Sequence, residues 1–324
     1  MAYRHFNRFE WLNQDLSKVD KQELDLLVRQ NQMIDLMQHD KWLANIETNL
    51  PIAKTQTRLT RKWNKRDGQC LVCGAGPSLY SHLPDINLAQ SDYNFYVIAT
   101  DRAVKPLINY GIIPDMIITI DAAPHILDFF EGVELPKGTK VAVCLHTDPK
   151  VVQYFINQKC KLYFYYVINP FSFTASQVLQ KYGDRWAMLR TGLTVSFSAV
   201  DMAYWMGFTG IFTIGNDLAF LNYEDAKKHI VKFPDTIIPV NSKTHPFTIN
   251  YFAQAAWAMR MFPMLHGNEA AFIDVSGGLL KHKWQHGEFR LTYKVNPVNS
   301  LYNQIDYRYI YNKQPIKTAA GAGV

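Results

Sequence analysis

The sequence has few cysteines, four among 324 residues. Cys70 and Cys73 form one C-x-x-C pair inside an apolar run, and neither Cys144 nor Cys160 belongs to a second pair with the spacing of zinc ligands. Structural zinc sites and disulfide-stabilised small domains need more cysteines in close spacing than this. We therefore expect reduced thiols in the core, and we name no metal ligand.

The sequence also lacks long apolar segments, and its net charge is small. No uninterrupted apolar run reaches the ~18 residues that a membrane span needs. Residues 1–10 are polar and aromatic, without the apolar region of a signal peptide. These absences predict a cytoplasmic protein with no membrane span. The formal net charge of +6 is small for this length and supports a small anionic ligand or an acidic surface about as well as nucleic acid, so charge decides little. We expect no nucleic-acid partner.

Apolar residues are plentiful, at 48% of the chain, which is enough to bury a sizeable core. Short β-rich runs separated by helix-length spacers occupy residues 96–99, 116–120, 141–145, 162–168 and 211–214. Near-continuous apolar strands that alternate with helices indicate a parallel sheet covered on both faces. The predicted class is α/β, a Rossmann-like fold. Thr194 is a candidate cap for a helix that buries Phe197 and Val200 and ends near Gly207.

The two ends of the chain lack this alternation. Between residues 20 and 37 apolar side chains recur at three- and four-residue spacing, as on an amphipathic helix: Leu24, Leu27, Val28, Met33, Leu36 and Met37. From about residue 287 the composition turns to Tyr, Asn and Pro without clear periodicity. We predict an N-terminal helical arm at 1–66, a nucleotide-binding core at 67–286 and a C-terminal extension with a frayed tail at 287–324.

A glycine turn follows the first apolar run of the core. Its sequence is Cys73-Gly74-Ala75-Gly76-Pro77-Ser78-Leu79. Gly74 suits a turn with positive φ, Gly76 leaves room for a ligand, and Pro77 suits the first turn of a helix. Backbone N–H groups and the helix dipole favour a phosphate at such a place. The third glycine of G-x-G-x-x-G and the Gly-Lys-Ser/Thr of a P-loop are both missing, so a plain strand-to-helix turn stays an open alternative.

Three aspartates directly follow predicted strands: Asp101, Asp121 and Asp217. Ligands of doubly wound sheets bind beyond the carboxyl ends of the strands. Carboxylates at this edge could hydrogen-bond a ribose, hold Mg²⁺ or act as acid and base. The alternative is that each one caps the helix that follows its strand.

His229 is the histidine that we single out as a general base. It follows Asp217 by twelve residues in a polar segment that we interpret as a loop. A histidine near a strand-end carboxylate can accept a proton at neutral pH. His125 and His146 also follow strands and are rivals, and an ordinary surface histidine remains the alternative.

Four segments, taken in order and spacing over about 70–230, carry a family resemblance. They are the glycine turn, Ala99-Thr100-Asp101-Arg102-Ala103, Gly111-Ile112-Ile113-Pro114-Asp115 followed by Asp121, and Gly215-Asn216-Asp217-Leu218-Ala219-Phe220 followed by His229. Together they resemble the superfamily of Maf motility accessory factors and MptE-like 6-hydroxymethylpterin diphosphokinases. The chain departs from the pattern at Thr194, where the family often has Asn. It departs again at 274–278, which lacks the Glu of the Maf Thr-Glu-Gly-Gly element.

The resemblance implies a transferase with a nucleotide donor. It implies catalytic roles for His229 and Asp217, and a nucleotide site at Gly74, Ala75, Gly76, Pro77, Ser78, Asp101, Asp121, Thr194 and Asn216. Maf proteins transfer CMP-activated nonulosonic acids to flagellin, and we favour this branch, with a CMP-sugar donor and a hydroxyl acceptor on protein or glycan. The pterin branch instead moves diphosphate from ATP to 6-hydroxymethyl-dihydropterin with Mg²⁺. A catalytically idle nucleotide-binding scaffold is the third reading.

Overall fold

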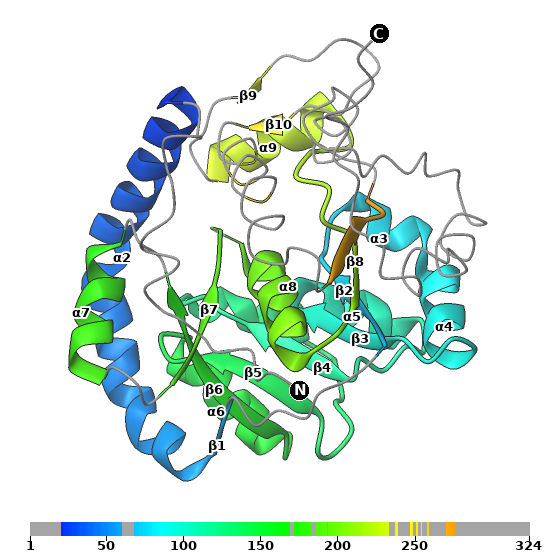
Figure 1. The fold of residues 1–324 in the computed structure, drawn as a ribbon, viewed down its shortest axis with the longest axis horizontal. Helices are drawn as coiled ribbons and strands as arrows, with labels where there is room; N and C mark the ends of the chain where they lie inside the picture. Colours follow the sequence, from blue (N-terminus) through cyan, green and yellow to red (C-terminus); the bar gives the residue numbers. More distant parts are fainter. Residues whose placement is uncertain are drawn as a thin grey trace, which may run out of the picture.

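A parallel sheet forms the centre of the protein (Figure 1). The computed structural model describes residues 21–59, 68–168, 172–182, 186–192, 194–232, 237–238, 247–248, 251, 254, 258 and 270–276. Within these residues the sheet contains β1 (Thr57–Arg58), β2 (Gln69–Cys73), β3 (Tyr96–Thr100), β4 (Met116–Thr119), β5 (Lys140–Cys144), β6 (Lys161–Ile168), β7 (Ala187–Arg190), β8 (Gly210–Ile214) and β11 (Ala271–Asp274). Eight strands follow the order β1-β6-β5-β4-β3-β2-β8-β11, and β7 pairs with the far end of β6. Every pairing in this sheet is parallel.

The strands are apolar on both faces because both faces are covered. β3, β4 and β8 are buried along their whole length. An α-helix or a 3-10 helix follows most strands, which is the arrangement that parallel neighbours require. The predicted Rossmann-like α/β class is therefore confirmed.

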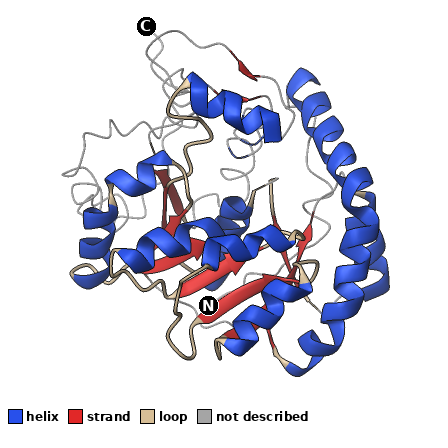
Figure 2. Ribbon diagram, turned by 180° about the vertical axis from the view of Figure 1, so that it is seen from behind, coloured by secondary structure: helices blue, strands red, loops and turns tan. Residues whose placement is uncertain are grey.

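Helices follow most strands of the sheet in the part of the chain that the structure describes. They are α3 (Pro77–Ser81), α4 (Leu83–Ser91), α5 (Asp101–Asn109), the 3-10 helix η2 (Pro124–Phe130), α6 (Pro149–Asn157), α7 (Phe173–Tyr182), α8 (Val195–Met206) and α9 (Tyr223–Lys232). α8 crosses one face, and α4, α5 and α6 cover the other, as the views from the front and from behind show (Figures 1 and 2). α8 begins after Thr194 and ends at Gly207, whose φ of 94° closes the helix in the left-handed region. Both predicted ends of this helix are confirmed.

The order of the strands reverses beside β2. From β2 the chain runs outward through β3, β4 and β5 to β6 and β7, and α8 then brings it back to β8 on the other side of β2. Doubly wound sheets bind their ligands in the crevice outside the carboxyl ends of the strands at such a switch point. Here that point lies between the loops that follow β2 and β8.

The predicted N-terminal arm contains one long helix, α2 (Lys21–Thr55), which lies beside α7 along the β6 edge of the sheet (Figures 1 and 2). The predicted apolar face is wrong at the two positions whose burial the structure describes, because the side chains of Leu36 and Met37 are exposed. The helix instead buries Asn45 and Asn49. Their side-chain amides donate to backbone carbonyls of the loops that follow β4 and β5: those of Ala122, Leu145, His146 and Thr147.

The domain boundaries remain predictions. Two residues of the predicted arm, in β1, pair with β6 and so belong to the central sheet. The extension at 287–324 lies outside the described residues. Among the helices that the structure describes, none combines the length and the apolar character of a membrane span.

Candidate functional site

The loops after β2 and β8 are joined by backbone hydrogen bonds at the switch point. The N–H of Gly74 donates to the carbonyl of Ile214 at 2.8 Å, and that of Gly76 donates to Gly215 at 2.7 Å. Positive φ occurs at Gly215, at 69°, and not at Gly74, so the predicted reason for a glycine at 74 is wrong. Gly74 is instead needed because a Cβ there would collide with the carbonyl of Gly215.

An anion already lies at the start of α3, and it is the carboxylate of Asp217. The backbone N–H and the hydroxyl of Ser78 both donate to Asp217 Oδ2, at 3.1 and 2.8 Å. Ser78 Oγ also accepts from the N–H of Gly215 at 3.0 Å. A carboxylate at a helix N-terminus is stabilised by the same amides and dipole that would hold a phosphate. The predicted phosphate cradle of Gly74, Gly76 and Ser78 therefore has its N–H groups engaged within the protein.

Gly76→Ala is expected to lower the free energy of unfolding by about 1–3 kcal/mol, the usual cost of overpacking. The added Cβ would meet the Asp217 carboxylate and, at 2.7 Å, the carbonyl oxygen of Gly215. Ala75→Ser adds one atom to the half-buried neighbour and serves as the control in urea denaturation. Equal midpoints for the two variants would show that Gly76 does not pack against these groups.

The first turn of α8 lies against the glycine turn. A Cβ on Gly74 would stand 3.1 Å from Ser196 Oγ. Thr194 is the N-cap residue as predicted, but its side chain makes no capping hydrogen bond. In the part of the chain that the structure describes, the amides of Val195 and Ser196 have no hydrogen-bond partner. The half-buried start of α8 thus offers the donors that α3 does not.

The two other predicted aspartates lie together on the β3 and β4 side. Asp101 is buried and accepts from the N–H of Arg102 at 2.8 Å and from Thr119 Oγ1 at 3.3 Å. Burial raises the pKa of Asp101 to about 6, and the nearby charge of Asp121 adds to the rise. Asp121 is exposed and accepts from the N–H of Ala123 at 3.1 Å. A single pocket shared by Asp101, Asp121 and Asp217 remains a prediction.

Asp274, at the end of β11, was not predicted as a site residue. It is buried and accepts from Thr213 Oγ1 at 2.6 Å. Burial raises the pKa of Asp274 to about 7, and the negative charge of Asp217 contributes. Next to it the buried Asn216 donates its backbone N–H to Ser276 Oγ at 2.9 Å. The sequence signal was an aspartate that ends an apolar run at 271–273, the same signal as for the three predicted aspartates.

Asp274→Asn is expected to make the protein gain stability relative to wild type as pH rises. The folded pKa of about 7 lies above the ordinary 3.8, so the wild-type carboxyl stabilises the fold most below pH ~4. This contribution is lost as pH rises to about 7. The amide of asparagine does not titrate, so the variant should gain about 1–3 kcal/mol on wild type between pH 5 and pH 8. Urea denaturation at both pH values measures this gain.

The exposed Asp128→Asn is the control for that comparison. It removes the same charge at a surface position and should show no comparable gain. A pH-independent difference between Asp274→Asn and wild type would mean that Asp274 stays ionised in the fold.

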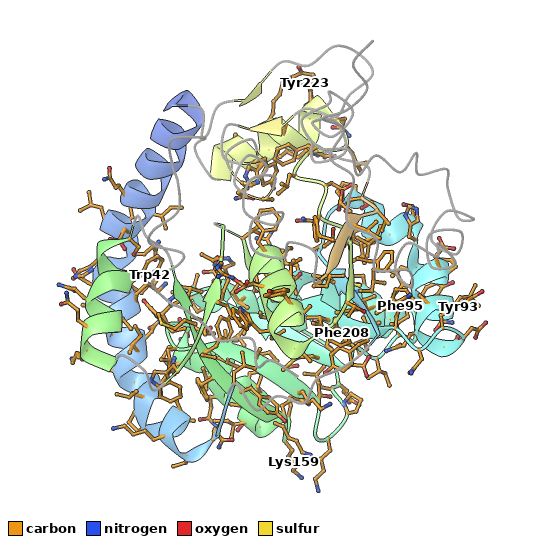
Figure 3. All side chains as sticks on the ribbon, viewed as in Figure 1. Trp42, Tyr93, Phe95, Lys159, Phe208 and Tyr223 are labelled. Atoms are coloured by element: carbon orange, nitrogen blue, oxygen red, sulfur yellow. The ribbon has the colours of Figure 1, made fainter. Side chains whose placement is uncertain are left out.

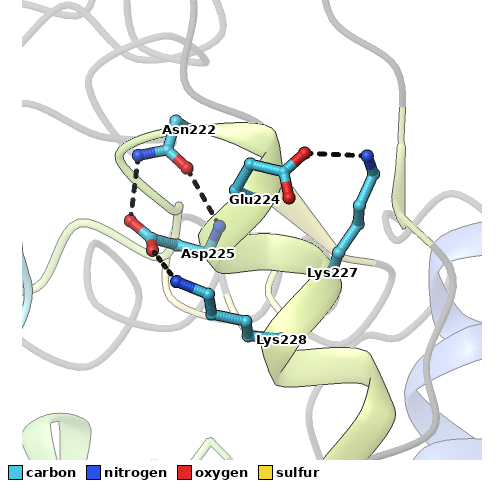
Figure 4. A network of polar contacts seen from close by, with 5 residues as sticks. All are labelled: Asn222, Glu224, Asp225, Lys227 and Lys228. Carbon is cyan, nitrogen blue, oxygen red and sulfur yellow. Dashed lines mark hydrogen bonds and ion pairs between the residues drawn. The ribbon is translucent and has the colours of Figure 1, made fainter.

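His229 lies in a helix, α9, and not in a loop, so that interpretation was wrong. Asn222 Oδ1 accepts from the N–H of Asp225 at 2.9 Å, and Asn222 Nδ2 donates to the Asp225 carboxylate (Figure 4). Asn three residues before Asp is a helix-start pattern that the sequence displays. Exposed ion pairs Glu224–Lys227 and Asp225–Lys228 line the same helix (Figure 4).

The ring of His229 belongs to an aromatic cluster. Its centroid lies 5.0 Å from that of Phe220 and 6.0 Å from that of Tyr251. Phe220 stands three residues after Asp217, so the loop that follows β8 links the histidine to the switch point. The half-buried His229 therefore stays a candidate base.

The rival His146 is buried behind α2. Trp42 extends from α2 towards the sheet and stacks on His146 with centroids 4.9 Å apart (Figure 3). Burial lowers the pKa of His146 to about 4, so its ring is neutral at pH 7. The other rival, His125, is half-buried at the start of η2 and lies edge-on to Phe129.

Comparisons with known proteins agree with this architecture. A solved structure of the MAf glycosyltransferase from Magnetospirillum magneticum AMB-1 superposes with a TM-score of 0.51 at 17% sequence identity, over 80% of this chain. The chain spans 39% of the length of that protein. At this identity the likeness concerns the fold. None of the curated proteins matches the sequence.

A family model also matches the sequence. The model of the 6-hydroxymethylpterin diphosphokinase MptE-like family covers residues 40–223, more than half of the chain. The match includes the second half of α2, the glycine turn, the aspartates after β3, β4 and β8, and the start of α8. The predicted family resemblance is thus confirmed, and the chain belongs to the MptE-like family.

Proposed function

We propose that the protein is a nucleotide-sugar-dependent glycosyltransferase that uses a CMP-nonulosonate donor and a hydroxyl acceptor on protein or glycan. The observation that carries the proposal is the start of α8, where Thr194 leaves the first amides uncapped against the glycine turn. A nucleotide phosphate satisfies such amides and complements the helix dipole. The family and the structural neighbour are both described as transferases, which supports the general class.

In the proposed sugar transfer, different residues bind the nucleotide and act on the acceptor. The start of α8 with Thr194, together with the backbone N–H of Ala75 at the glycine turn, holds the phosphate, and the ring of Pro77 borders it. Asn216 and Asp121 border the nucleotide. His229 removes the proton of the acceptor hydroxyl, because a base with a pKa near the working pH is effective in this step. Asp217 holds the glycine turn through Ser78 and presents negative charge next to the reacting groups.

The alternative is an ATP-dependent diphosphokinase, as the family description suggests. That reaction relies on positioning and on charge neutralisation by Mg²⁺. Among the described residues no three acidic, histidine or cysteine side chains come together as metal ligands, and no step above uses a metal. Loss of activity in EDTA would favour this alternative. A nucleotide-binding scaffold without activity is the second alternative.

Thermal unfolding with a panel of CMP, UDP, GDP and ATP tests the proposal. A ligand that binds the folded state raises Tm by mass action. We expect CMP to give the largest shift, and Thr194→Val to reduce it. Thr48→Val removes a hydroxyl that bonds only within α2 and is the matched control. A larger shift with ATP, followed by AMP release with the pterin alcohol, would overturn the glycosyltransferase proposal. A shift without either reaction would favour the scaffold.

A further inference from the structure

The carboxyl edge of the sheet is rich in carboxylates, which is unfavourable for a nucleotide phosphate. Asp101, Asp121, Asp217 and Asp274 all follow or end strands at this edge. The start of α3 is occupied by Asp217, and the amides at the start of α8 carry only partial charge. An anionic ligand at this edge would therefore bind better where a cation offsets the repulsion.

Arg102 provides an exposed guanidinium at this edge. It is the second residue of α5, directly after β3. Cys73 and Ala99 are register partners on the neighbouring strands β2 and β3. The glycine turn after β2 and the start of α5 after β3 therefore leave adjacent strands at the same, carboxyl edge of the sheet. Asp274 and Asp217 lie on the far side of β2.

An aromatic ring holds this guanidinium in place. The guanidinium carbon of Arg102 lies 4.5 Å from the ring centroid of Phe129, on η2 after β4. Among the described residues no carboxylate lies within ion-pair distance of it. Stacking on one face leaves the N–H edge of an arginine available for hydrogen bonds. The rings of Phe129 and His125 are perpendicular to each other, with centroids 6.2 Å apart.

We propose that Arg102, stacked on Phe129, is the cation that binds a phosphate oxyanion of the nucleotide at this site. The inference rests on the proposed nucleotide site and adds the residue that makes it attractive to an anion. A planar guanidinium binds phosphate through two parallel N–H···O bonds, which a lysine ammonium cannot reproduce.

The test measures the binding of CMP, ATP and inorganic pyrophosphate by isothermal titration calorimetry. For the nucleotide that wild type binds, Arg102→Gln should lower the affinity by ~10-fold or more, as expected for the loss of charge-assisted hydrogen bonds. Arg102→Lys should restore only part of the loss. Phe129→Leu keeps the charge and removes the ring, and should weaken binding several-fold. Lys150→Gln is the matched control, because Lys150 is exposed at the start of α6 after β5, and should leave the affinity within about twofold.

The outcomes separate this inference from the proposed function. Nucleotide binding that is unchanged in Arg102→Gln, or weakened equally in Lys150→Gln, overturns the role of Arg102 and leaves the nucleotide site standing. Binding of pyrophosphate that depends on Arg102, without binding of CMP or ATP, supports the anion site and contradicts the proposed function. Absence of binding by all three probes contradicts both. Arg102 and Lys150 are exposed, so their variants should keep the wild-type Tm, which confirms that they are folded. Phe129 packs against the core, so Phe129→Leu should lower Tm, and its binding is measured well below its own Tm.

Discussion

Asp201→Ala should lower the free energy of unfolding by about 3–5 kcal/mol, because it leaves a buried charge without its partner. Asp201 on α8 is fully buried, and its carboxylate accepts from Arg190 Nη1 at 2.9 Å and from the backbone N–H of Arg190 at 3.0 Å. Trp205 Nε1 donates to the same carboxylate at 3.3 Å. The pair ties the end of β7 to α8, and the turn with Thr194 lies between them.

Urea denaturation of Asp201→Ala beside Glu47→Ala checks this expectation. Glu47 forms an exposed pair with Lys181 at 3.8 Å, and its loss should change the free energy of unfolding by at most about 1 kcal/mol. Asp201→Asn keeps the shape and should fall between the two. If Asp201→Ala and Glu47→Ala were equally stable, the buried pair would not hold β7 and α8 together.

His229→Ala should lower turnover by ~10²-fold or more while nucleotide affinity stays nearly unchanged. The physical reason is that a missing base slows proton transfer from the acceptor and leaves the donor site intact. The assay uses a sugar donor of the nucleotide that the thermal-shift panel selects and a hydroxyl acceptor that supports turnover by wild type, and it measures initial rates together with nucleotide affinity.

Two variants make this result specific. His229→Gln retains a polar side chain of similar reach but cannot titrate near neutral pH, so it should be as slow as His229→Ala. His125→Ala removes the half-buried rival after β4 and should keep most of the activity. An active His229→Gln would assign His229 a packing role against Phe220 and Tyr251. A slow His125→Ala with a normal His229→Ala would transfer the role of base to His125.

The sheet could be predicted from the sequence because its strands are apolar on both faces. Runs such as 96–99 and 211–214 can be recognised as strands from their own composition. The helix-length segments between successive runs imply that the strands pair in parallel. β7 and β11 were missed because β7 has no β-branched residue and β11 has one, whereas the equally short β4 has three. The strand in the arm, β1, has two and depends entirely on its pairing with β6.

The site was predicted less well because its geometry depends on contacts between distant segments. Local sequence suggested that Gly76 makes room for a ligand, whereas Gly215 and Asp217 occupy the space around it. Arg190 carried no local signal, since only the fold brings it to Asp201. The helix at His229 was recognisable, because Asn222 and Asp225 have the spacing of a helix start.

The hydrogen bonds from Ser78 to Asp217 join residues that are 139 positions apart. Forming a contact at such separation costs the conformational entropy of closing a long loop, so it is slow during folding. β2 can pair with β3 at once, but the turn at the start of α3 has to wait for β8. We therefore expect the crevice to be among the last parts of the chain to assemble, and a fragment that ends before β8 to leave the N–H of Ser78 without its carboxylate.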